Sequence, residues 1–321
     1  MAKQAVLLLA HGTPETIEQI PEYLRNVVSG RSLAPQVIEE IQHRYSLIGR
    51  SPLTELTMEQ GRLVEAELAD GSAQAIRVYV GMRNWKPYIP DVVRQMREDG
   101  VEEAAVICMA PQNSRTSVGL YRRAVQAEAG NLRIDFTEGW AQDALLADAF
   151  AERLRPAISK LAAETGEPVP VLFTAHSVPL RTVQQTSASE SEPRLWPGEG
   201  ADPYAEETRH TAELVAARVP EIGQWWFAFQ SQGASGGPWI GPTVEETLTA
   251  IAGVGVKNLL LQPIGFLCDH VEILYDIDIA FRQYAVNLGI RLERPESLNA
   301  SPTLARAVAG LAHQGLTRLQ G

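Results

Sequence analysis

The sequence predicts an α/β protein with two similar doubly wound domains, each a four-stranded parallel sheet flanked by helices. Three observations favour this fold class. Short apolar runs alternate with longer amphipathic stretches along the whole chain. The runs lack polar alternation, which is typical of strands buried on both faces of a parallel sheet. One local pattern also occurs once in each half of the 321 residues, a length that suits two domains of roughly 150 residues.

Four strands are expected in each half of the chain. In the first half they are at residues 6–10, 76–80, 104–109 and 132–136. In the second half they are at residues 169–174, 225–229, 258–263 and 290–293. Amphipathic stretches at residues 51–69 and 143–161 predict helices between strands.

The domain boundary is expected near residues 163–168, where helix-stop and turn residues follow one another. We therefore expect a first domain of residues 1–164 and a second domain of residues 165–302. A C-terminal helix of about residues 303–321 is expected to pack back on the first domain.

Composition excludes several classes of protein. There are 28 Lys and Arg against 39 Asp and Glu, a net charge of −11, and no basic run, which disfavours a nucleic-acid partner. The two cysteines, Cys108 and Cys268, lie in apolar stretches without C-x-x-C spacing, so neither a disulfide framework nor a cysteine-bound metal is expected. No run approaches the roughly 18 apolar residues of a transmembrane helix, and no signal-peptide pattern is present, so we expect a cytoplasmic protein without a transmembrane segment.

The pattern shared by the halves places a histidine after the first strand of each. It reads L-L-A-H-G-T-P at residues 8–14 and F-T-A-H-S-V-P at residues 173–179. We interpret this as a duplication that presents His11 and His176 at the carboxyl ends of equivalent strands, where open α/β sheets bind ligands. A neutral imidazole can accept a proton or bind a metal there. The simpler interpretation is a strand-end histidine that only hydrogen-bonds a loop.

An acidic stretch follows the third strand of the second half, at residues 263–278. If Asp269 caps a helix, then Asp269, Glu272 and Asp276 share one face, where they could relay protons or pass a divalent cation toward a histidine. The alternative is an acidic face in solvent, with His270 as a structural histidine. A Gly- and Pro-rich loop at residues 229–243 could lie against a flat ligand, and no strand is followed by a phosphate-binding glycine fingerprint.

Together with short motifs at residues 30–31, 51–53 and 202–204, these three stretches resemble the ferrochelatase family over nearly the whole chain. The resemblance implies two Rossmann-like domains with a cleft between them, in which Fe²⁺ enters a porphyrin. His176 would meet the metal and accept pyrrole protons, and Glu272 would be its carboxylate partner. Fe²⁺ is then a substrate, and no organic cofactor is implied.

The short connection between residues 31 and 51 resembles the compact Gram-positive-type members, which act on coproporphyrin III. That porphyrin is our preferred substrate, in a monomeric enzyme that hands its product to a partner enzyme of haem synthesis. A polyanionic porphyrin needs cations, and the candidates are Arg31, Arg44, Arg50 and Arg115. Further expected substrate contacts are His11, Ser51, Tyr121, Gln230 and Trp239.

This sequence departs from the compact members at several positions. His11 replaces a tyrosine that ligates the metal, so we expect His11 to be a metal ligand. An arginine pair is replaced at Val28 and Ser29, and Asn84 stands where some relatives have histidine. Ala280 replaces a glutamate, which weakens an accessory divalent-cation site near Asp276. About fifteen additional residues, roughly 186–200, form either a surface insertion or a lid that brings Trp196 to the porphyrin.

Three alternatives stay open at this point. The enzyme could act on protoporphyrin IX, or it could insert cobalt or nickel into a tetrapyrrole, which paired His11 and His176 would suit. The chain could also be a tetrapyrrole- or metal-binding module without turnover. The presence of both His176 and Glu272 favours an enzyme.

Overall fold

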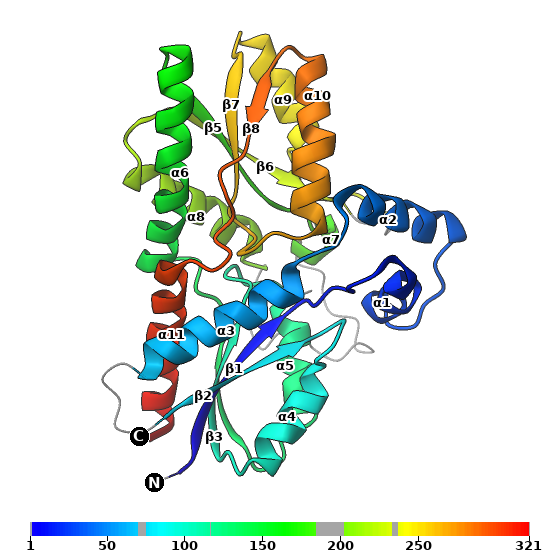
Figure 1. Cartoon of the computed structure of the whole chain (residues 1–321), viewed down its shortest axis with the longest axis vertical. Helices are drawn as coiled ribbons and strands as arrows, with labels where there is room; N and C mark the ends of the chain where they lie inside the picture. Colours follow the sequence, from blue (N-terminus) through cyan, green and yellow to red (C-terminus); the bar gives the residue numbers. More distant parts are fainter. Residues whose placement is uncertain (1, 70–74, 116, 184–201, 233–236, 321) are drawn as a thin grey trace. The chain divides into compact units, whose positions relative to one another are not determined.

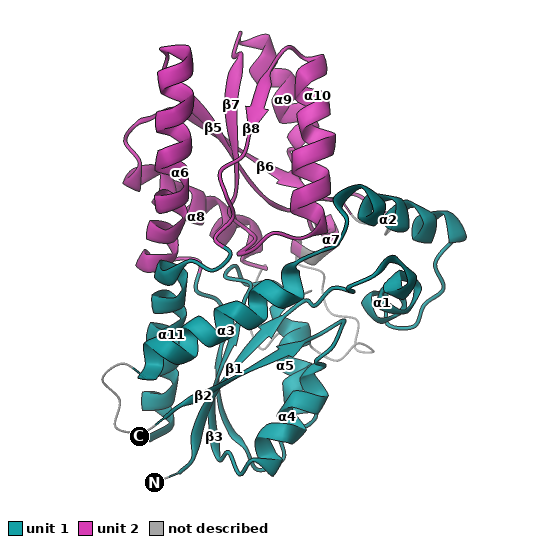
Figure 2. Ribbon diagram, viewed as in Figure 1, with its two compact units in different colours: residues 1–140, 299–321 teal, residues 141–298 magenta. Residues whose placement is uncertain are grey.

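The protein, seen here as a computed structural model, divides into two compact units (Figure 2). The structure describes residues 2–69, 75–115, 117–183, 202–232 and 237–320. Unit 1 comprises residues 1–140 and 299–321, and unit 2 comprises residues 141–298. The expected insertion at 186–200, with Trp196, lies outside the described residues.

Unit 1 contains a parallel four-stranded sheet in the order β2-β1-β3-β4 (Figure 1). The strands are β1 (Gln4–Ala10), β2 (Arg77–Met82), β3 (Glu103–Cys108) and β4 (Arg133–Thr137). The helices that pack on it are α3 (Leu53–Ala69), α4 (Ile89–Glu98), α5 (Val118–Gln126) and α11 (Pro302–Gln320). A 3₁₀ turn, Ile17–Gln19, and helices α1 (Ile20–Val27) and α2 (Pro35–Ile48) follow β1.

The core of unit 1 explains why its first strand has no polar alternation. Ala5, Leu7 and Leu9 of β1 join one hydrophobic cluster with side chains of α4 and α5. Val6 and Leu8, which point to the other face, are equally inaccessible. Because helices cover both faces of the sheet, every position of β1 after Gln4 is apolar and buried.

Unit 2 repeats this arrangement in the order β6-β5-β7-β8, again all parallel. The strands are β5 (Val169–His176), β6 (Ile222–Gln230), β7 (Asn258–Pro263) and β8 (Arg291–Glu293). The helices are α6 (Ala144–Thr165), α7 (Leu180–Val183), α8 (Tyr204–Arg218), α9 (Val244–Gly253), a π-helix η2 (Glu272–Phe281) and α10 (Arg282–Asn287). In both units the first strand lies between the second and the third, which confirms the predicted fold class of two similar α/β units.

The boundary between the units differs from the one expected at 164/165. It lies at 140/141, because α6 contacts β5, β7 and α8 and so belongs to unit 2. The expected turn does exist, with Gly166 at a φ of 73° ending α6, but it joins a helix and a strand of the same unit. At the other end of the chain, α11 contacts α3, β3 and β4, and the chain passes into unit 1 at Asn299.

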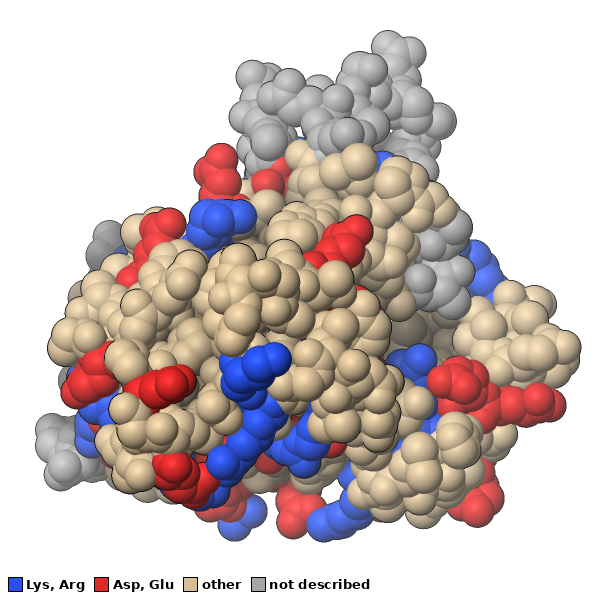
Figure 3. Space-filling view, turned by 90° about the horizontal axis from the view of Figure 1, so that it is seen from above, with Lys and Arg blue, Asp and Glu red and all other residues tan. Residues whose placement is uncertain are grey.

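The surface carries charges of both signs. On the face drawn in Figure 3, acidic and basic side chains are interspersed, and neither sign gathers in one large patch. Within the described residues, no helix combines the length and the apolar character needed to cross a membrane.

Candidate active site

The site in unit 2 begins at His176, the last residue of β5. Its carbonyl oxygen accepts a hydrogen bond of 2.9 Å from the buried Tyr204 hydroxyl. The next residue, Ser177, donates its N–H to Gln230 and its Oγ–H to Ile240, at 2.6 and 2.8 Å. These bonds hold the backbone at the end of the strand, so the imidazole projects from a rigid support.

Glu272 lies between two histidines. Its Oε1 is 3.5 Å from His176 Nε2, and its Oε2 is 3.5 Å from His270 Nε2. His270 is buried, and its Nδ1 donates to the Cys268 carbonyl oxygen at 3.1 Å, since a carbonyl only accepts. The Glu272 carboxylate therefore contacts His270, which a backbone hydrogen bond holds in place, and His176, about a third of whose side chain is accessible to solvent.

The charges in this group shift its protonation equilibria. Burial lowers the pKa of His176, but attraction and hydrogen bonding to Glu272 raise it by more, so the net pKa lies above its ordinary 6.5. Burial likewise raises the pKa of Glu272, and the two histidines outweigh it, so this pKa falls well below 4.5. His176 is thus a stronger base than a free imidazole.

Glu272 is the first residue of a ten-residue π-helix, η2. The i→i+5 hydrogen bonds of a π-helix give a wider turn than those of an α-helix, and such turns are frequent at functional sites. The next carboxylate on it, Asp276, is buried and accepts a hydrogen bond from Ser231 Oγ. Ser231 adopts a left-handed φ of 60°, which directs its side chain to this helix.

The expected helix cap at Asp269 is wrong. Asp269 precedes the helix, whose first turn has no side-chain cap, and it accepts from Ser297 at 2.6 Å and pairs with Arg294 at 3.2 Å. The Asp269 carboxylate thus binds Arg294 and Ser297 and does not cap the helix. Only Glu272 and Asp276 of the three expected carboxylates lie on η2.

Three more side chains complete the group around His176. The rings of Phe266 and Trp239 lie 6.2 and 6.5 Å from it, centroid to centroid. Gln230 is buried at the end of β6, accepts from Thr174 at 2.6 Å, and has its amide nitrogen 3.4 Å from the Glu272 carbonyl oxygen. The structure therefore brings four predicted residues of unit 2 together: His176, Glu272, Gln230 and Trp239.

A second group lies in unit 1, where His11 follows β1. His11 Nε2 is 2.8 Å from the Tyr23 hydroxyl, and the Asn84 amide nitrogen is 3.1 Å from His11 Nδ1. Gly12 adopts a φ of 76°, and a Cβ there would lie 2.7 Å from the Met82 Cβ. The turn after His11 therefore requires glycine, both for its backbone angle and for its close approach to the next strand.

Ser51 lies just before α3 and is buried. Among the described residues, its Oγ and the Thr13 Oγ1 have no hydrogen-bond partner although both are inaccessible. Thr13 and Thr54 are joined by two bonds of 3.1 Å between the backbone of one and the hydroxyl of the other. The hydroxyls of Ser51 and Thr13 are therefore buried polar groups without a partner among the described residues.

The predicted cations of unit 1 have different local partners. Arg44 pairs with Glu40 along α2, at 3.0 Å, and Arg50 pairs with Glu55, at 2.5 Å. Arg31 is exposed and bonds the Val28 carbonyl oxygen, at 3.0 Å, and Arg115 lies in the segment between β3 and α5.

Tyr121 is not at the surface. It belongs to the hydrophobic core of unit 1, with the Arg83 guanidinium 5.8 Å from its ring, and burial raises its pKa.

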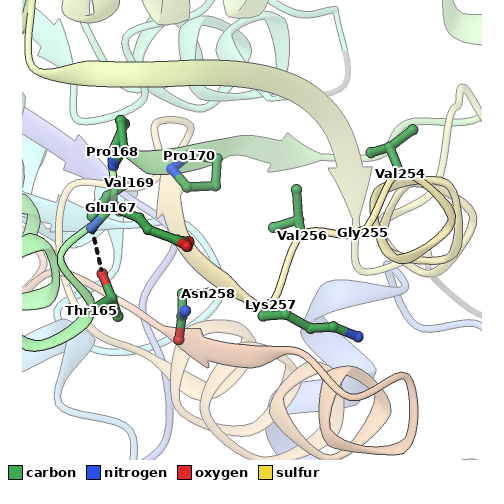
Figure 4. Close-up of a pocket in the computed structure, with 10 residues that line it drawn as sticks. All are labelled: Thr165, Glu167, Pro168, Val169, Pro170, Val254, Gly255, Val256, Lys257 and Asn258. Carbon is green, nitrogen blue, oxygen red and sulfur yellow. Dashed lines mark hydrogen bonds between the residues drawn. The ribbon is translucent and has the colours of Figure 1, made fainter.

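A pocket of about 310 Å³ lies at the amino ends of β5 and β7, remote from the carboxyl ends that carry His176 (Figure 4). It contains none of the predicted site residues. In the part of the chain that the structure describes, no group of three or more His, Cys, Asp or Glu side chains could hold a metal ion.

Three site residues do not stand out in the sequence: Tyr23, Ser231 and Phe266. Tyr23 is twelve positions from His11 on a separate helix, and no local pattern links the two. Phe266 lies in the apolar first part of the acidic stretch, where an aromatic residue predicts packing in the hydrophobic core. Ser231 could have been noticed as the polar residue that directly follows β6.

Comparisons with known proteins agree with this architecture. The family model described as Ferrochelatase matches residues 3–316. A ferrochelatase of Acidobacterium capsulatum is 62% identical over 319 residues, which cover 99% of this chain and 96% of that protein. A coproporphyrin III ferrochelatase of a Geobacillus species is 30% identical over 313 residues, 96% of each chain.

A similar solved structure is that of the sirohydrochlorin chelatase SirB from Bacillus subtilis in complex with cobalt, with a TM-score of 0.56 over 97% of this chain and 94% of that one. At 12% identity this likeness concerns the fold alone. The family model and the sequence relatives, by contrast, span nearly the whole chain. The protein belongs to the ferrochelatase family.

Proposed function

We propose that this protein inserts Fe²⁺ into a porphyrin, with His176 as the base and Glu272 as its partner. The observation that carries the proposal is the position of Glu272 between His176 and His270, at 3.5 Å from each. A carboxylate in this position stabilises the imidazolium that forms when a histidine takes a proton. His176 is also the residue that the rigid end of β5 presents.

The chemistry requires a base. Insertion replaces two pyrrole N–H protons by one Fe²⁺, so two protons must leave the macrocycle for each metal ion that enters. The neutral imidazole of His176 accepts a proton from a pyrrole nitrogen, and its neighbour Glu272 holds the resulting positive charge. Asp276, next along η2, offers the proton or the incoming cation a further carboxylate.

The metal needs few protein donors, because the four porphyrin nitrogens supply most of its ligands. Within unit 2, His176 offers a nitrogen and Glu272 offers an oxygen, and both are ligands that divalent iron accepts. Within unit 1, His11 offers a further nitrogen.

Coproporphyrin III is the preferred porphyrin in this proposal. It is supported by relatives that bear the name coproporphyrin III ferrochelatase and are about a third identical over nearly the whole chain. We expect Arg31, which is exposed, to contribute charge.

The test is metal insertion by the purified protein, with coproporphyrin III or protoporphyrin IX and with Fe²⁺ or Co²⁺. We expect Fe²⁺ and coproporphyrin III to be the fastest pair. His176→Ala should lower kcat at least about 100-fold, the range of a general base, and leave porphyrin binding intact. Near-wild-type turnover of His176→Ala would refute the proposal.

Unit 2 offers a matched control in a second His–Glu pair, His210 and Glu213, whose atoms lie 3.4 Å apart on α8. Both side chains are about half exposed, and neither contacts the group around His176. His210→Ala and Glu213→Gln should leave kcat unchanged, while Glu272→Gln should lower it. If both pairs behave alike, the geometry of Glu272 has no special role.

A further inference from the structure

One guanidinium group, that of Arg294, binds carboxylates on both sides of Glu272 in the sequence. Arg294 directly follows β8, which packs beside α10, the helix that continues η2 (Figure 1). Its Nε and Nη2 donate to Asp278 at 2.9 and 2.8 Å, and its Nη1 lies 3.2 Å from Asp269 Oδ1. Asp269 lies three residues before Glu272, and Asp278 lies six residues after it. The chain around Glu272 is therefore held at two points by a single group from outside η2.

Ser297 completes this network. Its Oγ accepts from Arg294 Nη1 at 3.1 Å and donates to Asp269 Oδ1 at 2.6 Å. Arg294 Nη1 also donates to the Pro295 carbonyl oxygen, at 3.1 Å. Only 11% of the Arg294 side chain is accessible and Ser297 is buried, so salt screens these contacts less than it screens exposed ion pairs.

The shape of arginine matters for this network. A guanidinium is planar, and its donors form a rigid fork that binds a carboxylate through two parallel hydrogen bonds, whereas the lysine ammonium is a compact point charge. In Arg294, the edge formed by Nε and Nη2 binds Asp278, while Nη1 faces Asp269. One rigid group thus sets the distance between the two carboxylates.

Glu272 depends on that distance. Its two carboxylate oxygens each lie 3.5 Å from a histidine nitrogen, one on His176 and one on His270, which is at the long end of hydrogen-bonding range. Any shift of the start of η2 toward one histidine moves the carboxylate away from the other. A displacement of about 1 Å at a reacting group can cost about 100-fold in rate.

We propose that Arg294 is a positioning residue: by holding the start of η2, it places Glu272 between the two histidines. The proposal rests on the proposed function, which makes Glu272 the partner of the base. Arg294 acts through the backbone of residues 269–278, without contact to the porphyrin or to iron.

The experiment measures Fe²⁺ insertion into coproporphyrin III by Arg294→Lys, in the wild-type and in the Glu272→Gln background. Lysine keeps the positive charge but cannot hold both carboxylates. In the wild-type background we expect kcat to fall about 10-fold with the KM for the porphyrin unchanged, and in Glu272→Gln we expect no further fall in kcat. A role in stability alone would lower kcat by the same factor in both backgrounds. That result, or an unchanged kcat, would overturn the proposal.

The matched control is Arg282→Lys. Arg282 Nη2 faces the same Asp278 carboxylate at 3.8 Å, but from α10 and with half of its side chain exposed. Arg282→Lys should leave kcat unchanged in both backgrounds. If Arg282→Lys and Arg294→Lys lower kcat equally, the contact of Arg294 with Asp269 has no special role and the proposal is wrong.

Ser297→Ala keeps the proposal testable if Arg294→Lys does not fold. It removes the hydroxyl that joins Arg294 to Asp269 and leaves both charges in place. We expect a smaller loss of kcat, about 3-fold, which again is absent in the Glu272→Gln background. An equal loss in both backgrounds, or no loss in either, would refute the proposal.

Amide hydrogen exchange separates this proposal from the proposed function. Exchange over residues 270–278 should be faster in Arg294→Lys than in the wild type and unchanged in Arg282→Lys. If the wild-type protein inserts no iron, the proposed function fails, and the exchange comparison alone decides: faster exchange in Arg294→Lys supports the positioning of Glu272, and equal exchange overturns it. If insertion proceeds and Arg294→Lys resembles Arg282→Lys in every measurement, the positioning role is wrong and the enzyme assignment stands.

Discussion

His176 shows how one residue acquires its chemistry from its neighbours. Burial alone would make the imidazole a weaker base, and the adjacent Glu272 reverses the sign of that effect. The same contact lowers the pKa of Glu272, so the pair is most strongly coupled when the histidine is charged and the glutamate is ionised. About a third of each side chain is accessible, so salt in the solvent weakens the interaction.

We therefore predict that Glu272→Gln reverses the pKa shift of His176. In the wild-type protein this pKa lies above 6.5, and in the variant it should fall below 6.5, because burial is then the dominant effect. Histidine resonances followed by NMR across pH 5–8 measure this directly, and His210→Ala is the control. A variant whose His176 pKa stays above 6.5 would contradict the electrostatic account.

The same shifts predict how stability depends on pH. The raised pKa of His176 contributes stability that is full below 6.5 and is lost as the pH rises through its folded value. The lowered pKa of Glu272 contributes stability that is present above 4.5 and is lost as the pH falls through its folded value. The difference in Tm between wild type and Glu272→Gln should therefore be largest between about pH 4.5 and 6.5. It should shrink on either side.

At the scale of elements, η2 is the unusual one. Ten residues of π-helix are far from the common short bulge, so contacts outside the helix must stabilise it. Besides the contacts of Glu272, two contacts hold the carboxylates further along the helix. Ser231 donates to Asp276, and Arg294 binds Asp278 through its Nε and Nη2, at 2.9 and 2.8 Å. The first ties the helix to the end of β6, and the second ties it to the segment after β8.

Removing the first contact should loosen the helix. In Ser231→Ala we expect faster amide hydrogen exchange over residues 272–281 and a loss of kcat, because Glu272 begins this helix. Thr165→Ala is the control, since it also removes a hydrogen-bonded hydroxyl in unit 2, but at the end of α6. The Thr165 hydroxyl donates to the Leu161 carbonyl oxygen at 2.9 Å and accepts from the Glu167 N–H at 3.4 Å. Equal exchange over 272–281 in both variants would show that Ser231 does not support η2.

At the scale of the whole molecule, the chain enters unit 1 twice. Helix α11 packs on β3, and a Cβ at Gly315 would lie 3.0 Å from the Ala105 Cβ and from Asp135 Oδ1. Asp135 is in turn held by Arg318, at 2.7 and 2.8 Å. The last helix therefore completes a core that begins with the first strand.

Two glycines of α11 test this arrangement. Gly315→Leu should destabilise unit 1 by about 1–3 kcal/mol through overpacking, whereas Gly310→Leu, where no atom lies within 4 Å of a Cβ, should be neutral or stabilising because leucine favours helix. Hydrogen exchange should show lost protection in residues 1–140 and 299–321 alone for Gly315→Leu. Equal loss throughout residues 141–298 would contradict the division into two units.

Much of this protein is readable from local sequence. Strands buried on both faces, such as β1 and β3, need continuous apolar runs, and these runs were predicted as strands. The repeated A-H-x-x-P pattern located His11 and His176. Glu272 lies in a stretch that resembles a motif of the ferrochelatase family. The comparisons confirm that the chain belongs to this family. These features are local because burial periodicity and short motifs act over a few residues.

Only the tertiary structure decided the rest. Whether α6 belongs to the first or the second unit depends on which sheet its apolar face meets, and nothing in its own sequence specifies that. Asp269 is not on the predicted helix face; its carboxylate forms an ion pair with Arg294, which is distant in sequence. Tyr23 contacts His11 because two separate elements of unit 1 meet at the carboxyl end of β1. Glu272 contacts two histidines because separate elements of unit 2 meet at the carboxyl end of β5. The sequence by itself determined which residues are buried and which motifs exist; which polar groups become partners was decided by packing, since a hydrogen bond depends on distances that only the folded chain defines.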